Sequence, residues 1–287
     1  ADDHARWLEA AAEGLARFGY ELDLDGIEVE VQDGEASVGE DVIRPDWLLP
    51  ALDAETLLAW RRSFGLWSEP RNLFATGVAR GHRSWRLAIH VPGEARLRFL
   101  GGADTPVARV LGPDVLLSHE LMHAWRDQTS DWLGWMREGS PTIDERNVRL
   151  TMSEGEAQFV MLALDRERRG YPIAGIGEGP AEHLTPRALG GVSRMPVDLS
   201  ASLGARFFAT HWRVGGWDQV REAWGRRPAS MEQFLHPETL GVDMPTRVDS
   251  PTWPATMPAA ERLAETTFGE AEIHLLLLDL GVEASVA

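Results

Sequence analysis

The sequence contains no cysteine and no lysine, and each absence excludes a class of site or partner. Without cysteine the chain forms no disulfide bond, and any metal site must be built from histidine and carboxylate side chains. All 28 basic residues are arginine, and 45 acidic residues bring the net charge to −17. This balance argues against nucleic-acid binding, which needs a basic surface, and against adhesion to an anionic membrane.

The sequence also lacks a long apolar run and a secretory signal at its start. The leucine run at 275–278 is far shorter than the roughly 20 residues that span a bilayer, so we expect no membrane span. Because the chain begins with Ala1 rather than Met, an exported protein, periplasmic or secreted, is slightly favoured over a cytoplasmic one. We expect one domain over residues 1–287, with lobes at about 1–130 and 131–287.

The most informative motif is His119-Glu120-Leu121-Met122-His123. Two histidines four positions apart lie on one helix face, so their imidazoles can hold one metal ion. Glu120 lies one position round the helix and can reach a metal-bound water without being a ligand itself. The helix is expected to begin after Pro113, with Asp114 as its cap.

A surface helix with an ordinary Glu/His pair is the plainer interpretation of this motif. Apolar residues at helical spacing, however, cover the side of the helix opposite the motif: Leu117, Leu121, Ala124 and Trp125. A surface helix would expose them, so we expect that side to lie in the core. The polar arc, which also includes Asp127, should then face a cleft.

Strand signals lie early in the chain and helix signals late, which indicates an α+β fold. Residues 27–31 alternate as a strand, and residues 85–100 alternate as a hairpin with one buried face and an arginine-rich outer face. Helices are expected at 2–18, 53–62, 143–169, 200–214, 217–224 and 259–280. Thr142 and Glu145 form a capping-box signal, residues 132–135 read as a short connection, and residues 237–258 as a loop.

Two histidines leave a catalytic zinc site one protein ligand short, because such sites use three protein ligands and a water. Glu154 and Glu156 are the candidates, since both lie in the strongly apolar helix expected over 143–169, where a buried carboxylate needs a partner. On a helix they point about 200° apart, so only one of them should reach the ion. The spacing leaves open which one it is.

The ordered set of motifs resembles the gluzincin zinc metallopeptidases and, more narrowly, a set of bacterial HExxH metallopeptidase-like proteins. The matching segments are residues 119–128, 154–157, 215–217 and 232–237. The resemblance implies a zincin-like α+β fold, in which a small N-terminal sheet and an active-site helix precede a mostly helical lobe. It also implies that His119, His123 and Glu154 bind Zn²⁺. Gln158 departs from the pattern, because that position often holds an acid that supports a histidine ligand.

The resemblance further implies a zinc-dependent hydrolase, a peptidase acting on a peptide or protein substrate. Glu120 would take a proton from a water that the metal activates and pass it to the leaving amine. A second group should stabilise the oxyanion, and three candidates are open: His236, His211 and Tyr171. The alternative is a zinc-containing, non-catalytic binding or scaffold protein. The presence of Glu120 argues against it, because a purely structural site has no use for that carboxylate.

The hairpin expected at residues 85–100 precedes the metal-motif helix. We expect it to lie near the metal site and to offer a strand edge to an extended peptide. The alternative is a hairpin whose strands are both paired on either side within a sheet.

Overall fold

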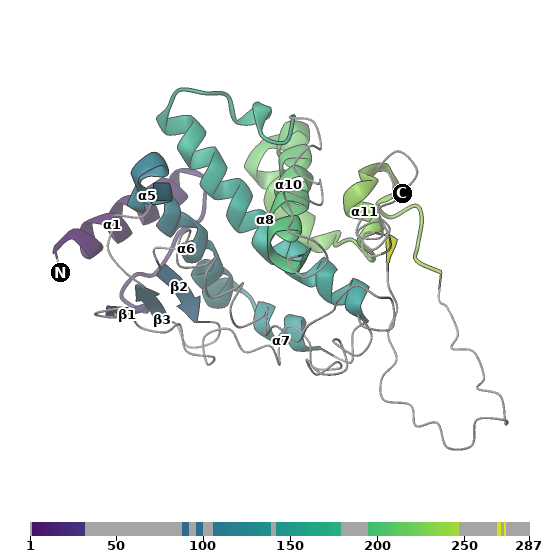
Figure 1. Cartoon of the computed structure of the whole chain (residues 1–287), viewed down its shortest axis with the longest axis horizontal. Coiled ribbons are helices and arrows are strands. Elements are labelled where there is room, and N and C mark those ends of the chain that lie inside the picture. Colours follow the sequence, from purple (N-terminus) through teal and green to yellow (C-terminus); the bar gives the residue numbers. More distant parts are fainter. Residues whose placement is uncertain are drawn as a thin grey trace, which may run out of the picture.

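The computed structural model describes residues 2–31, 88–91, 96–99, 106–138, 142–178 and 195–246, and three positions near residue 270. In chain order its elements are α1 (Asp2–Arg17), β1 (Glu28–Val31), β2 (Ala88–Val91), β3 (Arg96–Phe99), α5 (Pro106–Leu111), α6 (Pro113–Thr129), α7 (Trp132–Arg137), α8 (Ile143–Arg168), η2 (Ile173–Gly175), α10 (Met195–Glu222), η5 (Ala223–Gly225), α11 (Glu232–Leu235) and η6 (Pro237–Thr239). These residues are mostly helical, with a small sheet from the first part of the chain (Figure 1). The fold is therefore broadly α+β, as the sequence predicts.

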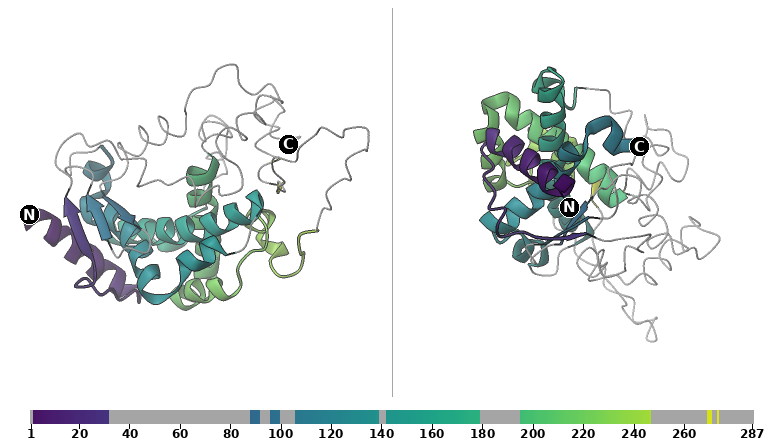
Figure 2. Two further views of the ribbon diagram at one scale, coloured as in Figure 1. Left: turned by 90° about the horizontal axis from the view of Figure 1, so that it is seen from below. Right: turned by 90° about the vertical axis from the view of Figure 1, so that its left-hand side faces the viewer.

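Three short strands form one mixed sheet in the order β1–β3–β2. β2 and β3 are antiparallel, which confirms the predicted hairpin, and β1 runs parallel to β3. Leu97 and Phe99 of β3 are fully buried, while Arg96 forms an ion pair with Glu28 of β1. The sheet lies toward the end of the molecule that carries α1, and β2 packs next to α6 (Figure 2).

Helix α8 is the centre of the fold, with α6 on one side and α10 on the other (Figure 1). Its predicted capping box is confirmed. The amide of Glu145 donates to Thr142 Oγ1 at 3.2 Å, and the amide of Thr142 donates to Glu145 Oε2 at 2.7 Å. The helix then runs without a break to Arg168, where basic residues complement the negative end of its dipole.

Two glycines allow α8 and α10 to cross with their backbones in contact. A Cβ atom added to Gly155 would collide with the backbone of Gly204, and one added to Gly204 would collide with the carbonyl oxygen of Thr151. Any side chain at either position would force the helices apart. The close contact with Gly204 therefore explains why the residue between Glu154 and Glu156 is a glycine.

The short connection predicted at residues 132–135 is wrong, because these residues begin α7. The Asp131 side chain caps this helix by accepting a hydrogen bond from the amide of Gly134 at 3.0 Å. The predicted helix end at Gly215 is confirmed as a break within α10, where Gly216 adopts a φ of 68° that favours glycine.

Some predicted elements lie outside the described residues: the helix at 53–62, most of the helix at 259–280 and the loop beyond residue 246. Within the part of the chain that the structure describes, no helix combines the length and apolar character needed to cross a membrane.

Candidate metal centre

Helix α6 carries the two histidines, and it is buried on all sides along its central turns. Pro113 occupies its first turn, while Gly112, at a φ of 95°, is the N-cap residue. The predicted cap by Asp114 is wrong, since that side chain makes no capping hydrogen bond and instead pairs with Arg168. His119, Glu120 and His123 of the predicted polar arc are buried, with α8 packed against α6, whereas Asp127 at the end of the arc lines a pocket.

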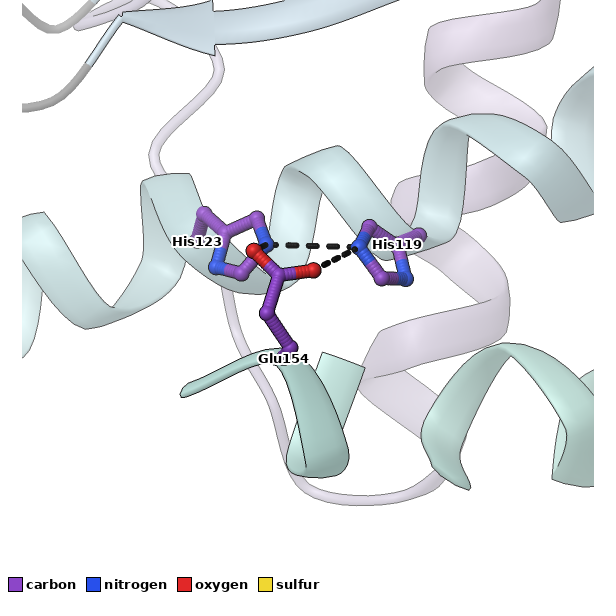
Figure 3. Close-up of side chains that lie close together, drawn as sticks. All are labelled: His119, His123 and Glu154. Atoms are coloured by element: carbon purple, nitrogen blue, oxygen red, sulfur yellow. Dashed lines mark hydrogen bonds and ion pairs between the residues drawn. The ribbon is translucent and has the colours of Figure 1, made fainter. Parts of the chain in front are cut away.

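His119, His123 and Glu154 come together between α6 and α8 (Figure 3). His119 Nε2 lies 3.3 Å from His123 Nε2 and 3.3 Å from Glu154 Oε2, and His123 Nε2 lies 3.7 Å from Glu154 Oε1. Each of the three residues is less than 10 % exposed. Among the described residues, this is the one group of three or more histidines and acids with ligand atoms close enough to share an ion.

Hydrogen bonding alone accounts poorly for these contacts. An imidazole nitrogen presents either one proton or one lone pair, so it makes one good hydrogen bond. His119 Nε2, however, has two partners at 3.3 Å, a carboxylate oxygen and a second imidazole nitrogen. A cation among the three side chains would accept a lone pair from each of them at once.

The spacing of the donor atoms fits a zinc ion. Four ligands placed tetrahedrally at about 2.0–2.1 Å from zinc lie about 3.3–3.4 Å from one another. His119 Nε2 lies at this distance, 3.3 Å, from both His123 Nε2 and Glu154 Oε2. The 3.7 Å contact of His123 Nε2 is to the other carboxylate oxygen, Oε1, so the carboxylate spans the two imidazoles. Two imidazoles and one carboxylate are also a donor set that zinc accepts, with a fourth position left for water.

Two neighbours hold the ring of His123. Ser153 Oγ lies 3.3 Å from His123 Nδ1, so this hydroxyl can accept a hydrogen bond from Nδ1–H when Nε2 faces a metal. The indole of Trp132 lies roughly parallel to the ring, with centroids 6.2 Å apart. The family resemblance places the support of a histidine ligand at position 158, where Gln158 departs from the pattern, and Ser153 was not predicted, although it directly precedes Glu154.

Glu120 follows His119 on α6 and is only 4 % exposed. It is not one of the three residues whose ligand atoms converge. This agrees with a position beside the metal ligands rather than among them, as the motif predicts for a proton acceptor.

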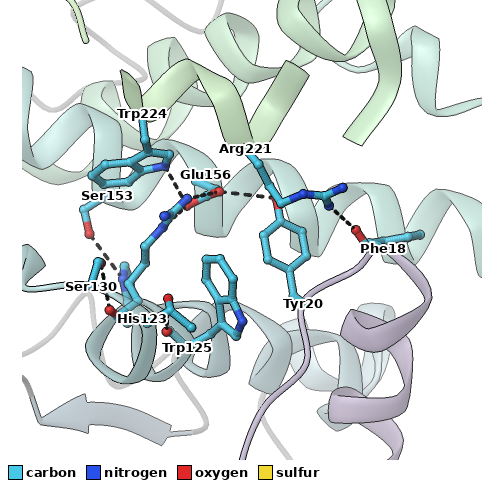
Figure 4. Close-up of polar contacts among 11 residues, drawn as sticks. Phe18, Tyr20, His123, Trp125, Ser130, Ser153, Glu156, Arg221 and Trp224 are labelled. Carbon is cyan, nitrogen blue, oxygen red and sulfur yellow. Dashed lines mark hydrogen bonds and ion pairs between the residues drawn. The ribbon is translucent and has the colours of Figure 1, made fainter. Parts of the chain in front are cut away.

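Glu156 belongs to a separate buried cluster on the same helix (Figure 4). Its Oε2 accepts from Arg126 Nε at 2.7 Å and from Trp224 Nε1 at 3.0 Å. Its Oε1 accepts from Arg126 Nη2 at 2.6 Å and from the Tyr20 hydroxyl at 3.2 Å. These four donors occupy the lone pairs of both oxygens, so Glu156 has no lone pair left for a metal.

Tyr20 is fully buried at this cluster. Burial, and next the negative charge of Glu156, raise the pKa of Tyr20 well above its ordinary value, because both disfavour the phenolate. The hydroxyl therefore stays protonated and remains a hydrogen-bond donor to Glu156.

None of the three oxyanion candidates is placed beside the metal ligands by a contact with them. His211 Nδ1 bonds the carbonyl of Phe207 on its own helix, and His236 is half exposed against Glu270 and Glu238. Tyr171 is 59 % exposed and follows the C-terminal end of α8. The 14 residues from Glu154 to Arg168 place that end about 21 Å away along the helix.

A pocket of about 710 Å³ opens at the C-terminal end of α6. It is lined by Ile27, Ala124, Asp127, Gln128, Thr129, Ser130, Asp131 and Leu133. Asp127 lies about one helical turn after His123, so this pocket opens one turn beyond the histidines on α6.

Comparison with protein-family models, with curated proteins and with solved structures finds no match to this chain. The chemistry and spacing of the three side chains are therefore what favours a metal centre here.

Proposed function

We propose that this chain is a zinc-dependent hydrolase of zincin-like fold that acts on a peptide or protein. The observation that carries the proposal is the convergence of His119, His123 and Glu154 at distances that suit a tetrahedral zinc site. Zinc bound there would polarise a substrate carbonyl and lower the pKa of a water molecule. The absence of cysteine leaves this donor set as the natural one for zinc.

In the proposed reaction, Glu120 is the proton acceptor and donor. Its place one residue after His119 directs it beside the ligand face, and its burial keeps its carboxylate away from bulk solvent. Ser153 would hold the His123 ring in the tautomer whose Nε2 lone pair faces the ion.

Strand β2 supports a peptide as the substrate. It packs next to α6, and it pairs with β3 alone among the described strands, so it is an edge strand of the sheet that the structure describes. An extended peptide could pair with this edge and lie across the metal centre, with selectivity supplied by side-chain pockets. The alternative is a hairpin with both strands paired on either side. In the described sheet β3 is paired on both sides and β2 on one.

A non-catalytic zinc protein is the second candidate, and the burial of the site favours it. His119, Glu120, His123 and Glu154 are all less than 10 % exposed, as in a closed structural site. The two functions differ in the need for Glu120, which a structural site does not use.

The test is Glu120→Gln, a nearly isosteric change that removes the proton acceptor. We expect the variant to keep its fold and about one zinc per chain, measured by thermal unfolding and elemental analysis. Cleavage of a peptide library should fall by about 10²–10⁴. A variant that cleaves at the wild-type rate would refute the mechanism. Zinc in both proteins with cleavage by neither would favour the structural role.

A further inference from the structure

We infer that Arg126 and Glu156 are positioning residues for the proposed metal centre. Their ion pair fixes α6 against α8 in the register that brings His123 and Glu154 together. This inference rests on the metal site of the proposed function and does not require hydrolysis.

The pair lies within one helical turn of the proposed ligands on both helices. Arg126 follows His123 by three residues on α6, which is about 4.5 Å along the axis. Glu156 follows Glu154 by two residues on α8, which is about 3 Å. A shift of either helix at the ion pair would therefore move the ligand atoms by nearly the same distance.

Both partners of the ion pair are constrained by further contacts. Arg126 forms two parallel bonds to the carboxylate, and its guanidinium lies 4.7 Å from the ring centroid of Trp125 and 4.1 Å from that of Trp224. The Glu156 side chain is 1 % exposed. A two-bond pair of this kind fixes orientation as well as distance.

The cluster also joins two other elements to the same point of α8. Tyr20 comes from the segment after α1, and Trp224 comes from η5, beyond the end of α10 (Figure 4). Metal affinity depends on ligand atoms held to within about 0.5 Å. The cluster therefore supplies the rigidity that two histidines and one glutamate on separate helices need.

The experiment compares Glu156→Gln with Asp144→Asn. Asp144 is a buried carboxylate on the same helix and accepts a hydrogen bond from the amide of Met231 at 3.1 Å, but it lies ten residues, about 15 Å, from Glu154. Both variants replace a buried carboxylate with an amide. Zinc affinity is measured by competition with a chelator, and ligand geometry by the visible absorption of bound Co²⁺ at saturation.

We expect Glu156→Gln to weaken zinc binding about 10–100-fold and to change the Co²⁺ spectrum, while Asp144→Asn alters neither. Wild-type affinity and spectrum in Glu156→Gln would overturn the inference, as would an equal effect of Asp144→Asn. A wild-type protein that binds neither Zn²⁺ nor Co²⁺ would overturn the metal site itself and this inference with it.

Two milder variants serve if Glu156→Gln does not fold. Arg126→Lys keeps the charge but loses the two-bond geometry, and Trp224→Phe removes one donor to Glu156. Both should weaken zinc binding by smaller factors, and wild-type affinity in both would overturn the inference.

Discussion

Glu154 and Glu156 are two residues apart on one helix and both are buried, yet their surroundings differ in kind. Glu156 receives four hydrogen bonds from the protein, two of them from an arginine. Glu154 meets two imidazoles, whose charge depends on protonation. The first carboxylate is neutralised within the protein, whereas the second faces groups that a cation can bind. Burial alone therefore does not distinguish a structural carboxylate from a candidate ligand, but its donors do.

The largest expected difference between the two carboxylates is in their contribution to the stability of the fold. Glu156→Ala leaves the largely buried Arg126 without its counter-charge, and we expect a loss of about 3–5 kcal/mol in the free energy of unfolding. Glu154→Ala leaves the two buried imidazoles facing one another and should cost less in metal-free protein. Urea unfolding of both variants without metal measures this, and equal losses would contradict the distinction.

The second prediction concerns zinc binding, for which the Glu154 variant should lose more than the Glu156 variant. Structural zinc sites bind with about 10–16 kcal/mol over four ligands, so one ligand contributes about 10²–10³-fold in affinity. Glu154→Ala should weaken zinc binding by this factor, as should His123→Ala. Glu156→Ala keeps all three proposed ligands, so it should weaken binding by the smaller factor of about 10–100 expected of a positioning residue and still be purified with zinc bound. Elemental analysis of the three proteins decides, and zinc loss confined to Glu156→Ala would reverse our assignment.

The motif helix and its partner show why parts of this site are predictable. The histidines share a face because helix periodicity demands it, and the capping box of α8 is a local signal. The order of motifs indicated Glu154, and the structure brings it to His119 and His123; that the group binds zinc stays a prediction.

Other parts depend on tertiary packing that no local pattern contains. Arg126 and Glu156 are 30 residues apart, and Tyr20 and Glu156 are 136 apart, so no spacing rule pairs them. Burial of the histidines also comes from α8 lying across α6. The prediction of a connection at 132–135 failed for a local reason, because Asp131 is a helix cap that the interpretation overlooked.

A third prediction probes the glycine between the two carboxylates. Gly155→Ala forces α8 and α10 apart, and overpacking of this kind typically costs about 1–3 kcal/mol. Gly225→Ala is the matched control, since its added methyl group would meet nothing within 4 Å. Thermal unfolding of both variants measures the difference, and similar melting temperatures would show that the crossing is looser than described.

The smallest expected effect is at Tyr20. Tyr20→Phe removes one donor to Glu156 and should cost about 1 kcal/mol near neutral pH. The raised pKa adds a pH dependence: the unfolded chain releases the phenolic proton near pH 10, while the folded chain retains it. Stability is therefore fully present below about pH 10 and falls as pH rises above it.

This loss of stability above about pH 10 can be assigned to Tyr20, because the chain has no lysine or cysteine and only two tyrosines. Urea unfolding at about pH 8 and about pH 11 should show it in the wild-type protein and in Tyr171→Phe, where Tyr171 is the exposed reference. Tyr20→Phe should largely lose it. A fall of the same size in Tyr20→Phe would assign the effect to another group.

The sequence separations at this site also set an order of assembly during folding. The contacts between α6 and α8 join residues 30 to 35 apart, whereas Tyr20 reaches Glu156 across 136 residues. Closing the longer loop costs about 1 kcal/mol more in chain entropy. We therefore expect α6 and α8 to meet first, with the three candidate ligands already between them. The segment after α1 would then dock onto Glu156 late and lock a pair of helices that had formed without it.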